Sequence, residues 1–142
     1  MNVPKLVVAW LVVGVVMNVL DFLVHGYILA STYAQLAFMR QDMSPVLMVV
    51  VEFVFALVFV VVYDRLYATA AASAGRGAAF GFWAGLLLSF PANIGMSLMF
   101  KNFPYWLAWA WTASGLITLT ISGAVAGALY AKKQAAAVRT VV

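Results

Sequence analysis

Four long runs of apolar residues dominate the chain, and charged or turn-forming residues separate them. The runs cover residues 6–30, 43–63, 78–100 and 103–131. About 20 apolar residues in a helix cross the ~30 Å hydrocarbon core of a bilayer. The alternating pattern of a membrane β-barrel strand is not found. The pattern therefore predicts an all-α polytopic membrane protein, a four-transmembrane-helix bundle in one domain, with a tail at 132–142.

The connections between the runs are short. Residues 31–42 either extend the first helix or form an amphipathic surface turn, and residues 101–104 form a tight hairpin. Residues 68–77 are a linker of small residues or a frayed helix end. The first run is too long for a signal-peptide core and holds three polar residues, so we expect it to be retained as a helix.

Composition excludes several classes of protein. Of 142 residues, 67% are apolar and only 8% are charged, with a mean hydropathy of +1.07. A soluble domain carries about a quarter charged residues, so a soluble enzyme, a DNA-binding module and a disordered tail are excluded. The absence of cysteine excludes disulfides, thiolate catalysis and cysteine-ligated metals. No basic patch is interleaved with aromatic residues, so no nucleic-acid partner is expected.

The basic residues are distributed unevenly between the two ends of the predicted helices. Arg40 and Lys101 fall at one end, and six fall at the other: Lys5, Arg65, Arg76, Lys132, Lys133 and Arg139. The positive-inside rule then places both termini in the cytoplasm, and the imbalance opposes a dual topology. The Ala-, Val- and Gly-rich composition favours a bacterial plasma membrane, with the lipid bilayer as the first partner.

Several polar side chains interrupt the apolar runs, although each is costly in a membrane. Asn18, Asp21 and His25 are spaced i, i+3, i+7 and share one helix face within about 60°. At about 1.5 Å per residue, five polar residues lie about 8–13 Å from the predicted outer ends of their helices. These are Asp21, His25, Glu52, Asn93 and Thr112. With Asn18 they form a predicted polar cluster, although Asn93 lies about 100° from the glycine row of its helix.

Four hypotheses account for this polar cluster. It is a hydrogen-bonded network that joins helices, with Asp21 and His25 as an ion pair, or it binds a proton, a cation or a small ligand. A divalent metal held by His25, Asp21 and Glu52 has suitable ligand types. A lone membrane histidine also fits an axial ligand of a haem or chlorin-type pigment. The sequence identifies no cofactor, and none of the familiar catalytic motifs is found.

Two rows of small residues mark the third and fourth runs. The rows are formed by Gly77, Gly81 and Gly85, and by Gly115, Gly123 and Gly127. Glycine at four-residue spacing lets helix backbones approach closely. We expect these rows to pack the bundle internally, and the alternative is an interface with another subunit.

The segment NVLDFLVHGYILASTY resembles a group of small bacterial four-span membrane proteins classed only as domains of unknown function. The matching features are Asp21, His25-Gly26, Tyr33, a glycine-rich third helix and a Gly-x-x-x-Gly fourth helix ending in Tyr130. This resemblance implies the four-helix architecture and carries no activity or catalytic residue.

These observations favour a non-enzymatic membrane protein, a homo-oligomer or an accessory subunit of a membrane complex. The alternative is a small oligomeric proton- or cation-coupled carrier, or a ligand-binding membrane protein, that uses Asp21 and Glu52. A membrane-embedded enzyme is the third hypothesis.

Overall fold

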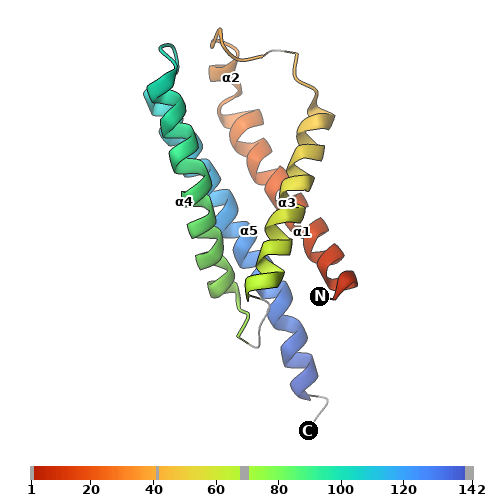
Figure 1. Cartoon of the computed structure of the whole chain (residues 1–142). Coiled ribbons are helices and arrows are strands. Elements are labelled where there is room, and N and C mark those ends of the chain that lie inside the picture. The colour runs from red at the N-terminus through yellow and green to blue at the C-terminus, as the bar shows by residue number, and fades with distance from the viewer. Residues whose placement is uncertain (1, 41, 68–70, 140–142) are drawn as a thin grey trace.

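The computed structural model describes residues 2–40, 42–67 and 71–139, with side chains as far as residue 131. These residues form helices and loops without strands. The elements are α1 (Val3–Asp21), a π-helical turn η1 (Phe22–Ile28), the short α2 (Ala30–Tyr33), α3 (Pro45–Tyr67), α4 (Ala74–Met99) and α5 (Tyr105–Arg139). The long helices run antiparallel in sequence order (Figure 1), so the predicted all-α four-helix bundle is confirmed.

The bundle has two ends with different chain segments. At the terminal end α1 and α4 begin, and α3 and α5 end (Figure 1). At the opposite end, called the loop end, lie residues 34–40 and 42–44 and the hairpin 100–104. Lys5, Arg65 and Arg76 lie at the terminal end, whereas Arg40 and Lys101 lie at the loop end, where Arg40 pairs with Asp42 at 3.2 Å.

Polar caps fix helix starts that differ from the predicted boundaries. The Asn2 side chain accepts from the Lys5 amide at 3.2 Å, so the first helix begins at Val3 rather than residue 6. Ser73 accepts from the Arg76 amide at 3.2 Å, which makes the end of the predicted linker the first turn of α4. Helix α5, which corresponds to the fourth apolar run, continues to Arg139, so part of the predicted tail is helical.

The largest helix interface joins α4 and α5, and it is built on the glycine rows. A Cβ placed on Gly77 would strike the Gly123 carbonyl oxygen, and one on Gly81 would strike that of Leu119. A Cβ on Gly85 would lie 3.0 Å from the Leu116 Cα. Only glycine therefore permits this backbone approach, and the rows pack α4 against α5 within one chain.

Aromatic rings join α3 to α4 near the terminal end. The Phe80 ring centroid lies 5.0 Å from that of Phe59, 5.4 Å from Tyr63 and 5.1 Å from Tyr67. We call these four residues the terminal aromatic cluster. Toward the loop end the two helices diverge (Figure 1), and every α3 side chain from residue 46 to 51 is exposed.

The four long helices meet the length and composition needed to cross a membrane, over Val3–Ile28, Pro45–Tyr67, Ala74–Met99 and Tyr105–Ala131. Large apolar side chains are exposed along all of them, for example Val8, Val54, Leu87 and Ile117. Such extensive apolar surface is typical of a lipid-facing bundle. The fold is therefore compatible with a multi-pass integral membrane protein.

Candidate functional site

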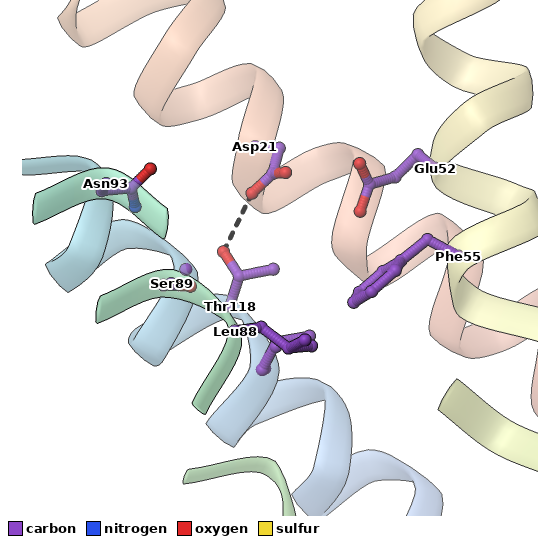
Figure 2. A pocket seen from close by; sticks show the side chains of 9 residues that line it. Asp21, Glu52, Phe55, Leu88, Ser89, Asn93 and Thr118 are labelled. Atoms are coloured by element: carbon purple, nitrogen blue, oxygen red, sulfur yellow. Dashed lines mark hydrogen bonds between the residues drawn. The ribbon is translucent and has the colours of Figure 1, made fainter. Parts of the chain in front are cut away.

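A cavity of about 260 Å³ lies between the four long helices, in the half of the bundle nearer the loop end. It receives side chains from α1, α3, α4 and α5 (Figure 2). Its polar lining comprises Asp21, Glu52, Ser89, Asn93 and Thr118, and its apolar lining comprises Phe55, Leu88, Gly115 and Leu119. The sequence had placed Asp21, Glu52 and Asn93 in one layer, and the structure brings these three side chains together.

Two carboxyl groups face each other in this cavity. Asp21 is the last residue of α1, and its Oδ1 accepts a hydrogen bond from the Thr118 hydroxyl on α5 at 3.0 Å. Glu52 projects from α3 on the other side of the cavity (Figure 2). The two carboxyl groups interact electrostatically across the cavity, one from α1 and one from α3, and Asp21 is also tied to α5.

Ser89 and Asn93 extend the glycine row of α4 into the cavity. The positions 77, 81, 85, 89 and 93 are spaced four apart, and each step rotates the row by about 40° around the helix. The glycines therefore face α5, Ser89 packs against Gly115 of α5 at the edge of the cavity, and Asn93 lines the cavity beyond it. The sequence places Asn93 about 100° around α4 from the glycine row. The rotation of the row explains how Asn93 can lie at this angle and still line the cavity with Asp21 and Glu52.

The electrostatics of the cavity are unbalanced. No lysine, arginine or histidine is among its lining residues. The remaining wall is apolar or neutral, so neither ionised carboxyl would have a cationic partner in the described lining. Charge in a low-dielectric surrounding must be paired or neutralised. The arrangement is thus suited to holding a proton or another cation between the two carboxyl groups.

The structure places three other predicted cluster members outside the cavity wall. Asn18 donates its amide to the Gly14 carbonyl in its own helix at 2.9 Å. Thr112 donates to the Ala108 carbonyl at 2.8 Å and lies in the α4–α5 interface. His25 turns toward Tyr33. Depth along the helix did not predict these contacts. The side chains of Asn18, Thr112 and His25 form hydrogen bonds with groups outside the cavity lining.

His25 belongs to a separate aromatic group at the loop end. Its Nδ1 is hydrogen-bonded to the Tyr33 hydroxyl, which also accepts from Trp111 Nε1 at 2.7 Å. An indole N–H only donates, so the Tyr33 hydroxyl hydrogen is left to point at His25. Burial raises the pKa of Tyr33, and the bond from Trp111 opposes that increase. The group ties η1 and α2 to α5.

A change in helix type separates His25 from Asp21. Beyond Asp21 the chain enters the π-helical turn η1, in which the Leu29 amide donates to the Val24 carbonyl at 2.8 Å. The ion pair predicted between Asp21 and His25 is not among the ion pairs of the described residues. Such turns recur at functional positions in helices. In this chain the turn η1 orients the His25 side chain toward Tyr33 rather than toward Asp21 and Glu52.

The three residues predicted as ligands of a divalent metal, His25, Asp21 and Glu52, do not form one group in the described part of the chain. The described residues contain no group of three or more His, Asp or Glu side chains arranged to hold a metal ion. Asp21 and Glu52 are together, but His25 is engaged with Tyr33. An axial ligand of a pigment would use a ring nitrogen of His25; the Tyr33 hydroxyl engages Nδ1, and the pigment hypothesis stays a prediction.

Sequence reasoning missed two of the polar lining residues, Ser89 and Thr118. The sequence contained a clue to each: Ser89 continues the row of residues at four-residue spacing, and Thr118 lies three residues beyond Gly115.

Comparisons with protein-family models, curated proteins and solved structures found no match to this chain. The resemblance to small bacterial four-span proteins therefore stays a prediction.

Proposed function

We propose that this protein is a multi-pass membrane protein that binds a cation in its intramembrane cavity, as a small cation- or proton-coupled carrier or a cation-binding membrane protein. The observation that carries the proposal is the pair formed by Asp21 and Glu52, which meet in a cavity without a basic lining residue.

The energetics favour a positively charged occupant. Two like charges about 4 Å apart repel by about 4 kcal/mol at an effective dielectric constant of about 20. A proton or cation between the carboxyl groups removes that repulsion and replaces it with attraction. The neighbouring Asn93 and Ser89 supply further oxygen atoms for a bound cation. The bundle therefore provides a place for one positive charge in an otherwise apolar interior.

The charge distribution supports an orientation for this site. The basic residues concentrate at the terminal end, so that end is proposed to face the cytoplasm, in a bacterial plasma membrane. Glu52 lies about 10 Å along α3 from Pro45 at the loop end. The cavity would then lie in the outer half of the bilayer, within reach of the external face.

The accessory-subunit hypothesis stays a prediction, as does a homo-oligomer. Its main support was the small-residue rows, which could have faced another subunit. In the structure Gly81 and Gly123 face the partner helix of the same chain. Those rows are therefore occupied internally, which leaves the cation site as the better supported basis for function.

The test compares thermal unfolding of the protein in mild detergent between about pH 5 and 9, with and without sodium, potassium or lithium. When both carboxyl groups are ionised their repulsion is unrelieved, so we expect stability to fall as the pH rises and a bound cation to restore it. Asp21→Asn and Glu52→Gln should each abolish this response while the fold is retained. Asp42→Asn, which removes an exposed carboxyl at the loop end, is the matched control and should keep it.

Two outcomes would count against the proposal. A wild-type protein whose stability does not respond to pH, to an alkali-metal ion or to an organic ammonium ion would leave no basis for a cation site. Variants of Asp21 and Glu52 that alter stability without changing the cation response would instead indicate a structural hydrogen-bonded network.

A further inference from the structure

We infer that the cavity takes the head of an amphiphilic primary amine, whose apolar chain leaves the bundle between α3 and α4 into the lipid. This inference rests on the proposed cation site and names its ligand class. It follows from the position of the cavity mouth, the kind of polar atoms in the cavity and the cavity volume.

On this inference the mouth of the cavity opens sideways, between α3 and α4, toward lipid. The terminal aromatic cluster joins α3 and α4 near the terminal end, and the two helices diverge beyond it (Figure 1). On this side the wall is formed by Phe55 of α3 and Leu88 of α4, and Leu88 is 49% exposed (Figure 2). Both rims are apolar, so an alkyl chain passes between them without desolvating a polar group.

The polar part of the cavity matches a primary ammonium group. Such a group carries three N–H donors, as a lysine side chain does. Asp21, Glu52 and Asn93 line the cavity from three different helices, and each side chain carries an oxygen that can accept a hydrogen bond. A quaternary ammonium has no donor, and it is recognised by cages of aromatic faces. Among the described lining residues Phe55 alone is aromatic, so the cavity favours the primary amine.

The volume limits how much of the ligand enters. The cavity measures about 260 Å³, the space of about nine water molecules at ~30 Å³ each. Sites for drug-sized ligands measure about 300–1,000 Å³. An ammonium head with its first carbon atoms fits, whereas a long alkyl chain must extend through the mouth. The ligand therefore lies partly in the protein and partly in the bilayer.

The experiment uses the full chain in phosphatidylcholine nanodiscs and follows thermal unfolding during titration with four probes. The probes are decylamine, decyltrimethylammonium, methylamine and sodium. We expect decylamine to stabilise the protein at lower concentration than decyltrimethylammonium. Glu52→Gln should weaken decylamine binding by about thirtyfold or more, which corresponds to about 2 kcal/mol for an unpaired charge. Asp42→Asn should leave it unchanged.

A matched pair of variants tests the sideways mouth. Leu88→Trp places a large ring at the rim of the cavity, whereas Leu87→Trp places the same ring on the adjacent, 73% exposed position that does not line it. We expect Leu88→Trp to weaken decylamine binding about tenfold or more relative to Leu87→Trp. Methylamine binding should be the same in both variants, because it does not occupy the mouth.

The outcomes separate this inference from the proposed function. A response to sodium or protons without any response to decylamine would overturn the inference and leave the cation site standing. Equal affinity for decyltrimethylammonium would refute the primary-ammonium match. Equal decylamine binding by the two tryptophan variants would refute the mouth between α3 and α4. No response to any probe or to pH would overturn both proposals.

Discussion

Replacing Gly81 by alanine tests whether backbone contact between α4 and α5 holds the bundle together. The added Cβ would strike the Leu119 carbonyl oxygen, and it would lie 2.7 Å from the Leu119 carbonyl carbon and 3.0 Å from the Thr120 Cα. All three are backbone atoms of α5, so no side-chain rotation relieves the clash. The two helices must therefore separate, and the neighbouring glycine contacts must loosen with them.

The magnitude follows from a comparison with Gly95 on the same helix. A Cβ on Gly95 meets nothing within 4 Å. Alanine gains about 0.5–1 kcal/mol over glycine inside a helix, and this gain is common to both substitutions. Overpacking a tight interface costs about 1–3 kcal/mol. We therefore expect Gly81→Ala to be less stable than Gly95→Ala by about 1–3 kcal/mol, and Gly95→Ala to equal or exceed the wild type.

The assay is unfolding of both variants and the wild type in mixed micelles with increasing dodecyl sulfate, followed by circular dichroism. The midpoint should fall for Gly81→Ala and not for Gly95→Ala. Equal midpoints for the two variants would show that the glycine row does not set the α4–α5 distance. The same result would favour the alternative hypothesis, in which the glycine row forms an interface with another subunit.

Two further predictions concern topology and the aromatic group. Because the chain has no cysteine, a membrane-impermeant maleimide should label Asp42→Cys in intact cells and Arg76→Cys only after permeabilisation; the reverse pattern would overturn the orientation. A double-mutant cycle of Tyr33→Phe and Trp111→Phe should give a coupling free energy of about 0.6–1.7 kcal/mol, since the indole donates to the phenol across α2 and α5; additive effects would contradict that bond.

Hydrophobic patterning was sufficient to predict the four helices, because membrane-spanning segments must be long, apolar and internally hydrogen-bonded. Their ends were less predictable, since they depend on single caps. Asn2 and Ser73 extend α1 and α4 by several residues toward the terminal end. The run of alanines after Lys133 contains no helix breaker, and α5 continues through it.

Distance along each helix was enough to assign Asp21, Glu52 and Asn93 to one layer. It could not say which way a side chain turns or what it meets there. Thr112 and Thr118 both lie on the small-residue face of α5, yet Thr118 bonds to Asp21 whereas Thr112 bonds to its own helix. The turn η1 also changes the helical spacing beyond Asp21, which sequence periodicity does not reveal.

Two sets of contacts hold α3. The terminal aromatic cluster holds one end against α4, and Trp10 of α1 holds the middle by donating to the Phe53 carbonyl at 2.7 Å. Over the ~16 Å between Tyr63 and Glu52, a tilt of α3 by about 5° about the aromatic cluster would displace Glu52 by about 1.4 Å. Because Phe53 follows Glu52 directly and is bonded to α1, such a tilt would have to carry α1 along or break that bond. If α1 moves with α3, the distance between Phe55 and Leu88 would change while Asp21 and Glu52 move together.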